Sequence, residues 1–179
     1  MSVETKLDIR DLKSLIRDVP DFPKPGIIFK DITPLLKNPA ALRSACLHLA
    51  DRFSGLSIDQ VVAIESRGFI FGTAIAMQLQ AGVVPVRKSG KLPAKTEAIS
   101  YSLEYGEDHL EIHSDAIQPG TKVIIIDDLL ATGGTCQAVV QLVEKLGGTV
   151  LGLGFLIELL FLKGRERLQG QCVQSLISF

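Results

Sequence analysis

The sequence predicts an α/β fold in which helices flank a mostly parallel central sheet. Short, fully apolar runs such as residues 61–64 and 123–126 alternate with stretches of helical periodicity, and strands that are buried on both faces have this composition. The alternation of strand and helix is typical of parallel connections. With 179 residues the chain is long enough to bury one sizeable core, so we expect a single domain over residues 1–179.

Composition and charge exclude several classes of protein. The 19 Lys and Arg against 20 Asp and Glu give a net charge of −1, whereas a general nucleic-acid binder needs an excess of positive charge. The longest apolar run, residues 150–162, is interrupted by Glu158, and no signal peptide is recognised, so we expect no membrane association. The widely spaced Cys46, Cys136 and Cys172 predict small core residues in a reducing compartment, the cytoplasm.

The N-terminal elements are predicted from spacing and from prolines. Apolar residues near the N-terminus repeat at helical spacing: Leu12, Leu15, Ile16 and Val19. They predict a helix that Pro20 ends. Residues 21–31 hold two prolines and a glycine, which predicts a stiff loop. Asn38 and Pro39 suit the cap and first position of the next helix, and Gly55 closes it.

The remaining elements alternate between strand and helix. We expect strands at residues 61–64, 83–87, 99–105, 110–113, 123–126 and 150–157. The third and fourth of these would form a hairpin. Helices are expected up to Leu79 and from the turn at residues 131–135 to Leu146. Residues 88–97 are basic and rich in Gly and Pro, which indicates a loop, and the strand at 123–126 is expected to stop at the paired acids that follow it.

The first candidate site is the turn after residues 123–126. In open α/β sheets ligands bind at the carboxyl ends of the strands. Asp127 and Asp128 follow a buried strand, and two adjacent carboxylates are costly there unless they accept hydrogen bonds. The turn opens a helix, whose first N–H groups bind anions; its residues are Ala131, Thr132, Gly133, Gly134 and Thr135. A ribose phosphate fits both features, with its 2′ and 3′ hydroxyls on the acids and its 5′-phosphate on the turn.

Two rival interpretations of this turn were weighed. The acidic strand end of a P-loop NTPase, which binds magnesium, requires GxxxxGK[ST] nearby, and the sequence has no such motif. A plain strand, turn and helix with a solvated acidic turn stays open.

A second candidate site follows the strand at residues 61–64. Its turn reads Glu65-Ser66-Arg67-Gly68. Arg67 together with Arg87, Lys88 and Lys91 would bring four positive charges to one end of the sheet. Such a cluster is either solvated surface or, joined to the first site, a place for a second and more highly charged phosphate group.

Together these motifs resemble the type I phosphoribosyltransferase family and, within it, the adenine phosphoribosyltransferases. Residues 123–135 resemble the motif that binds phosphoribosyl pyrophosphate (PRPP). Four further segments match in order between about residues 20 and 168: PKPGIIFKD at 23–31, ESRGF at 65–69, RKSGKLP at 87–93 and YSLEYG at 101–106. Lys30 stands where many relatives have arginine.

The resemblance implies a fold and an activity. The fold would be that of the type I phosphoribosyltransferases, with an N-terminal base-binding hood (residues 1–35) and a flexible catalytic loop (residues 88–108). The reaction would convert adenine and PRPP to AMP and pyrophosphate in purine salvage. Mg²⁺ would be carried mainly by PRPP and pyrophosphate, with no metal ligands on the protein. The enzyme would be a cytoplasmic homodimer in which Arg87 reaches the neighbouring subunit's site.

The resemblance also assigns roles to residues. Asp127, Asp128 and residues 131–135 would bind the ribose and the 5′-phosphate. Pyrophosphate would be bound by Ser66, Arg67, Arg87, Lys88, Lys91 and Tyr105. Glu104 and Arg67 would be catalytic, with Glu104 managing the proton at N7 of adenine. The adenine site would comprise Ile28, which reads the base with its main chain, Phe29, Lys30 and Leu159. A cis peptide bond between Glu65 and Ser66 is implied as well.

Two alternative functions stay open at this point. The paired acids do not encode the base, so a phosphoribosyltransferase for another base would carry them too. A non-catalytic regulator could use the fold to sense PRPP while it binds DNA. Such a regulator would be expected to add a DNA-binding domain or a basic face, and the sequence shows neither.

Overall fold

The computed structural model describes residues 6–102 and 107–179. Contacts within the chain divide it into two compact units, Met1–His48 and Leu49–Phe179. We describe each unit by itself. The first unit contains the segment predicted as the hood, residues 1–35, and this assignment as a base-binding element stays a prediction.

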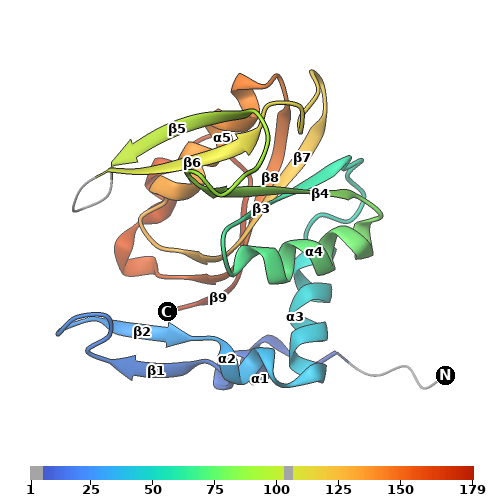
Figure 1. Cartoon of the computed structure of the whole chain (residues 1–179). Helices are drawn as coiled ribbons and strands as arrows, with labels where there is room; N and C mark the ends of the chain where they lie inside the picture. The colour runs from blue at the N-terminus through green and yellow to red at the C-terminus, as the bar shows by residue number, and fades with distance from the viewer. Residues whose placement is uncertain (1–5, 103–106) are drawn as a thin grey trace. The chain divides into compact units, whose positions relative to one another are not determined.

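The first unit holds a two-stranded antiparallel ribbon and short helices (Figure 1). Its elements are α1 (Ile9–Ser14), β1 (Arg17–Pro20), β2 (Ile28–Asp31), α2 (Thr33–Leu36) and the greater part of α3 (Pro39–Asp51). Asn38 caps α3, because its Oδ1 accepts a hydrogen bond from the N–H of Ala41 at 3.1 Å. The cap predicted from the sequence is therefore confirmed.

Two predictions for this unit were wrong. The first helix ends at Ser14 rather than Val19, and the predicted loop at 21–31 ends in a strand. The physical reason is pairing across the ribbon, which overrides local spacing. Val19 lies opposite Phe29. The ribbon is further tied by the Arg17 guanidinium, whose Nη2 lies 2.5 Å from Oδ2 of Asp31.

The second unit is built on a seven-stranded sheet (Figure 1). Its strands are β3 (Gln60–Ile64), β4 (Gly82–Lys88), β5 (Thr96–Ser102), β6 (Glu107–His113), β7 (Lys122–Leu130), β8 (Thr149–Glu158) and β9 (Val173–Ser178). The order across the sheet is β5-β6-β4-β3-β7-β8-β9. β6 pairs antiparallel with both of its neighbours, β5 and β4, and all the other pairings are parallel. The mostly parallel sheet is therefore confirmed. β9 was not expected.

Helices cover both faces of this sheet. The helices of the unit are α4 (Gly68–Leu79), α5 (Gly134–Lys145), and the single 3-10 turns η1 (Leu160–Leu162) and η2 (Gly164–Arg167). Gly72 of α4 packs against Ala63 of β3. The neighbouring Val62 points to the other face, where it joins a buried cluster with Val139 and Leu142 of α5. Successive strand residues point to opposite faces, so α4 and α5 flank the sheet as the sequence predicted.

The strand that carries the paired acids is longer than predicted. β7 continues through Asp127 and Asp128 to Leu130 and keeps pairing with β8, where Asp127 lies opposite Phe155. The expected stop at the acids was wrong because the main chain of β7 is satisfied by β8, while the Asp128 carboxylate has a cationic partner.

The cysteines differ in their exposure. Cys46 and Cys136 are buried, as predicted, but Cys172 is exposed. It lies in the link between η2 and β9, an element that the sequence analysis had not placed, so the prediction of a core position was wrong. In the parts of the chain that the structure describes, no helix has both the length and the apolar character needed to cross a membrane.

Candidate active site

The two candidate turns meet at one edge of the sheet. β3 and β7 are parallel neighbours, so the residues at their carboxyl ends lie side by side. The guanidinium Nε of Arg67, in the turn after β3, lies 2.9 Å from Oδ2 of Asp128. The N–H of Asp128 donates a hydrogen bond to Oδ1 of Asp127 at 2.8 Å. The structure thus joins the acidic and the cationic motif in a single site.

Gly68 makes this close approach possible. A Cβ at Gly68 would lie 2.8 Å from the Ile126 carbonyl oxygen and 3.0 Å from Oδ1 of Asp127. Any larger residue would push the start of α4 away from β7. The peptide bond between Glu65 and Ser66, just before this helix, is cis, as the resemblance implied.

The electrostatics of the acid pair favour a ligand with hydrogen-bond donors. Burial raises the pKa of Asp127 well above its ordinary value, and the neighbouring charge of Asp128 raises it further. Burial also raises the pKa of Asp128, although the Arg67 guanidinium counteracts that rise. A ligand that donates hydrogen bonds to these carboxylates stabilises their ionised form. The two neighbouring hydroxyls of a ribose supply two such donors.

The predicted phosphate turn surrounds a small cavity at the start of α5. The cavity measures about 60 Å³, and the residues lining it are Asp127, Leu129, Leu130, Ala131, Thr132, Gly133, Thr135, Cys136 and Phe155. Gly133 is the N-cap of α5 with a φ of 81°, a conformation that favours glycine. The first N–H groups of α5 face this turn, which is the geometry of an anion site.

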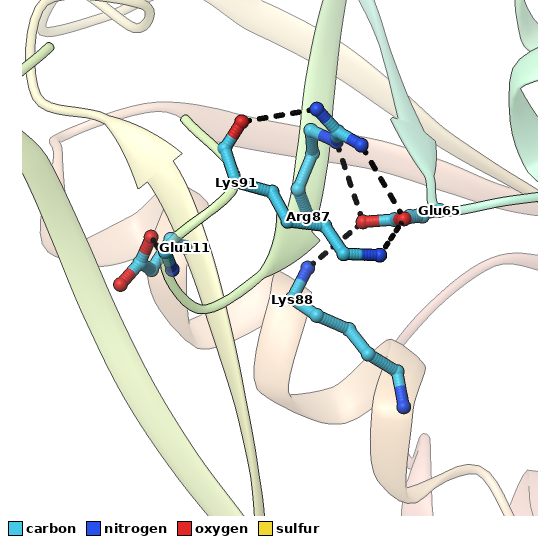
Figure 2. A network of polar contacts seen from close by, with 6 residues as sticks. Glu65, Arg87, Lys88, Lys91 and Glu111 are labelled. Atoms are coloured by element: carbon cyan, nitrogen blue, oxygen red, sulfur yellow. Dashed lines mark hydrogen bonds and ion pairs between the residues drawn. The ribbon is translucent and has the colours of Figure 1, made fainter. Parts of the chain in front are cut away.

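Three of the residues predicted to bind pyrophosphate, Arg87, Lys88 and Lys91, gather around one carboxylate (Figure 2). Oε2 of Glu65 accepts a hydrogen bond from the Lys88 main-chain N–H at 3.1 Å and lies 3.3 Å from Nε of Arg87. The Lys91 ammonium forms an ion pair with Oε1 of Glu65. Arg87 also donates from Nη1 to the Lys91 carbonyl at 3.0 Å. We call Glu65, Arg87, Lys88 and Lys91 the cationic cluster.

A carboxylate inside an expected anion site was not foreseen. Burial by itself would raise the pKa of Glu65, but hydrogen bonds from Lys91, Lys88 and Arg87 together lower it below its ordinary value. Glu65 is therefore an anion held by cations. The sequence signal was its place at the head of the turn after a buried strand, but the analysis had assigned ligands only from Ser66 onward.

A second carboxylate holds the loop that follows β4. Glu111 of β6 accepts hydrogen bonds from the Ser89 hydroxyl at 2.6 Å and from the Gly90 N–H at 3.0 Å. It lies beside the cationic cluster in Figure 2, where it faces away from Glu65. Glu111 thus fixes the path of this loop through Ser89 and Gly90, and these hydrogen bonds do not involve Arg87 or Lys91.

The pairing of the two strands predicted as a hairpin is confirmed over the described residues. β5 and β6 pair from Thr96 opposite His113 to Ser102 opposite Glu107. Glu104 and Tyr105 fall outside the described residues, so their roles stay predictions. The flexibility assigned to residues 88–108 likewise stays a prediction.

The adenine residues belong to two different units of the chain. In the first unit, Ile28 is 56% exposed, and the Phe29 ring packs edge-on against Phe22 with the centroids 5.2 Å apart. The Lys30 ammonium lies 2.6 Å from Oδ1 of Asp18. Leu159 belongs to the second unit and directly follows β8. The sandwich of the base between Phe29 and Leu159 therefore stays a prediction.

Comparison with known proteins decides the family. The family model described as "Phosphoribosyl transferase domain" matches residues 32–170. The adenine phosphoribosyltransferase of Symbiobacterium thermophilum is 58% identical over 169 residues, which cover 94% of this chain and 99% of that protein. The chain belongs to the adenine phosphoribosyltransferase family.

Solved structures of the same family agree with the fold described above. The adenine phosphoribosyltransferase of Thermoanaerobacter pseudethanolicus has a TM-score of 0.93 and 53% identity, covering 96% of this chain and 99% of its own. The enzyme of Saccharomyces cerevisiae was solved with an imino-altritol bisphosphate and adenine. It has a TM-score of 0.88 and 42% identity, and the match covers 94% of this chain and 97% of that chain. The type I phosphoribosyltransferase fold expected from the resemblance is confirmed.

The acid pair was also examined as a metal site. Over residues 6–102 and 107–179, no group of three or more His, Cys, Asp or Glu side chains could hold a metal ion. One carboxylate of the pair is already bound by Arg67. Oxygen donors suit Mg²⁺, and the expectation that PRPP carries this ion stays a prediction.

Proposed function

We propose that this chain transfers the phosphoribosyl group of PRPP to adenine, releasing pyrophosphate and forming AMP for purine salvage. The observation that carries the proposal is the edge of the sheet where the acid pair, an anion-binding turn and a cationic cluster lie together. The family of the chain supports the choice of base, because the relatives that cover almost all of it are adenine phosphoribosyltransferases.

The acid pair and the phosphate turn bind the sugar part of PRPP. Asp127 and Asp128 accept hydrogen bonds from the 2′ and 3′ hydroxyls. The N–H groups of residues 131–135, at the positive end of the α5 dipole, bind the 5′-phosphate. The anomeric carbon is thereby held between the phosphate turn and the cationic side of the site.

The cationic side stabilises the leaving group. As the bond between the anomeric carbon and the pyrophosphate oxygen breaks, negative charge grows on the pyrophosphate and positive charge on the ribose. Arg67, Arg87, Lys88 and Lys91 stabilise that negative charge, together with Ser66, an electrostatic role that is usually the largest single contribution to catalysis. When bound with PRPP, Mg²⁺ would supply further charge neutralisation on the pyrophosphate.

The base is read by the first unit of the chain. Pro20 lies opposite Ile28 in the ribbon, and because proline has no N–H it cannot donate to the Ile28 carbonyl. That carbonyl accepts from the 6-amino group of adenine, and the Ile28 N–H meets N1. Phe29 and Leu159 hold the two faces of the base. Glu104 accepts the proton from N7 as N9 bonds to the anomeric carbon and gives it up to water after AMP has left, and Tyr105 closes the site.

The active enzyme is a homodimer in the cytoplasm. Three large apolar side chains of the second unit are exposed: Ile70 is 41% exposed, Met77 78% and Val83 42%. Ile70 and Met77 are two turns apart on α4, so they share a face. Sedimentation velocity is expected to give twice the chain mass of 19.4 kDa, and Met77→Asp is expected to shift the protein toward the single chain. A wild-type protein that sediments as one chain would contradict this.

Release of pyrophosphate from PRPP, measured with each purine and pyrimidine base in turn, tests the proposed function. Adenine is expected to give turnover with AMP as the second product. Turnover with another base only would identify a different phosphoribosyltransferase. Tight binding of PRPP without turnover for any base would identify a sensor instead of an enzyme.

Glu65→Gln is expected to tighten pyrophosphate binding by about threefold to tenfold. The carboxylate competes with the leaving group for Arg87 and Lys91, and each partly exposed ion pair contributes up to about 1 kcal/mol. Inhibition by added pyrophosphate measures the effect, with Glu111→Gln as the matched control, because that carboxylate holds the same loop through Ser89 and Gly90. Weaker inhibition in Glu65→Gln alone would show that Glu65 orders the cations for the ligand.

A further inference from the structure

A buried carboxylate at the end of β8 lies outside every role assigned so far. Glu158 is 3% exposed. Its two oxygens accept from the Arg165 guanidinium in a two-pronged arrangement, with Nε at 2.6 Å from Oε1 and Nη2 at 2.7 Å from Oε2. The Ser175 hydroxyl donates to Oε2 at 2.5 Å, and Arg165 Nη1 donates to the Val173 carbonyl at 3.0 Å. Arg165 is thus fastened to both β8 and β9.

The residue beside this arginine touches the phosphate turn. A Cβ at Gly164 would overlap the Ala131 carbonyl oxygen and would lie 2.9 Å from Cδ1 of Leu130. In the same way, a Cβ at Gly133 would collide with the Gly164 carbonyl oxygen. The main chain of Gly164 therefore presses directly on the turn, with no side chain between them, and forms its back wall.

The geometry of this pair is specific enough to transmit position. A guanidinium that binds both oxygens of a carboxylate is fixed in distance and in angle. Charges that leave water lose hydration, so a pair of this kind is weak evidence for stability as such. Its structural consequence is that η2, and with it Gly164, is held at one place relative to β8 and β9.

We propose that Glu158 and Arg165 are positioning residues for the 5′-phosphate turn. By locking η2 onto β8 and β9, they hold Gly164 against Ala131 and Gly133 and keep the N–H groups of the turn aimed at the phosphate. This inference rests on the proposed function, since it assumes that the turn binds the 5′-phosphate of PRPP and AMP. Displacement of about 1 Å in such a binding element can cost up to a hundredfold.

Arg165→Lys tests the proposal, because lysine keeps the charge but loses the two-pronged geometry. Calorimetric titration with AMP, which carries a 5′-phosphate, is expected to show affinity reduced about tenfold to a hundredfold. Binding of pyrophosphate, which uses the cationic cluster instead, is expected to change less than about twofold. The split between the two ligands is the readout that a loss of overall stability would not produce.

A second variant and a control complete the experiment. Glu158→Gln keeps the size of the side chain but can accept only one of the two hydrogen bonds from Arg165. It is therefore expected to weaken AMP binding, as Arg165→Lys does. Glu166→Gln replaces an exposed carboxylate on the same short helix and is expected to leave both affinities unchanged. Equal loss of AMP and pyrophosphate binding, or none, in both Arg165→Lys and Glu158→Gln would overturn the positioning role. Failure of the wild-type protein to bind AMP would instead overturn the proposed function.

Discussion

Replacing Asp127 and Asp128 together by asparagine is expected to weaken PRPP binding by about 10²- to 10⁴-fold. Each carboxylate is proposed to accept a charge-assisted hydrogen bond from a ribose hydroxyl, and such a bond contributes roughly 1.5–3 kcal/mol. Losing both hydrogen bonds costs about 3–6 kcal/mol of binding free energy. Because about 1.4 kcal/mol corresponds to a tenfold change in affinity, this is about 10²- to 10⁴-fold. Calorimetric titration with PRPP measures the loss.

Asp59→Asn is the matched control for this experiment. The Asp59 carboxylate accepts a hydrogen bond from the Lys122 N–H at 2.8 Å, at the start of β7. It therefore lies at the opposite end of the strand that carries the acid pair. Its replacement is expected to leave PRPP affinity unchanged, whereas a double variant of the acid pair that binds PRPP as the wild type does would exclude a role in sugar binding.

The same acid pair is expected to destabilise the unliganded protein. Burial and the charge of Asp128 raise the pKa of Asp127 above its ordinary value of 3.8, so between the unfolded and the folded pKa the unliganded folded protein holds more protons than the unfolded chain does. The contribution to the free energy of unfolding is then most favourable at low pH and is lost as the pH rises from about 4 through the raised pKa. Asp127→Asn should therefore melt at a higher temperature than wild type at pH 7, and the difference should shrink toward pH 4.

Glu104→Gln is expected to lower kcat by about 10²-fold or more while PRPP affinity changes little. Glutamine keeps the size of the side chain but cannot accept the proton at N7 of adenine, and general acid–base catalysis contributes typically about 10²- to 10⁴-fold. Steady-state kinetics together with PRPP titration separates the two effects. The acid-pair variants should show the reverse pattern, with binding affected first.

A carboxylate of β6 supplies the control for Glu104→Gln. Glu111 lies on β6 and holds Ser89 and Gly90, so Glu111→Gln is expected to retain most of kcat. Normal turnover in Glu104→Gln would show that another group, or water, handles the proton.

Much of the fold was predictable because its signals are local. The apolar runs in β3 and β7 and the apolar face of α5 are short-range patterns that burial in a parallel sheet requires. The ribbon of β1 and β2 was not predictable in the same way. Its strands are defined by each other, through pairs such as Val19 with Phe29, whereas the helical spacing from Leu12 to Val19 predicted a helix there. β9 similarly depends on its pairing with β8.

The site shows the same division. The rule that ligands bind at the carboxyl ends of strands was enough to bring Asp128 and Arg67 together before their ion pair was seen. Glu65 was missed because its partners Arg87 and Lys91 come from another strand and loop. In the sequence Glu158 appears only as an interruption of an apolar run, because nothing near it identifies Arg165 as its partner.

The ratio of kcat/KM for adenine and for hypoxanthine tests the central claim most directly. Hypoxanthine carries an oxygen at position 6 and a hydrogen on N1, so both proposed main-chain bonds to Ile28 would be mismatched. Each unmade buried hydrogen bond costs about 1–3 kcal/mol. The kcat/KM for adenine is therefore expected to exceed that for hypoxanthine by at least tens-fold, and by over a hundredfold if both hydrogen bonds are lost in full. With adenine, AMP and pyrophosphate should appear in equal amounts. Comparable kcat/KM values for the two bases would contradict the assignment of adenine as the substrate.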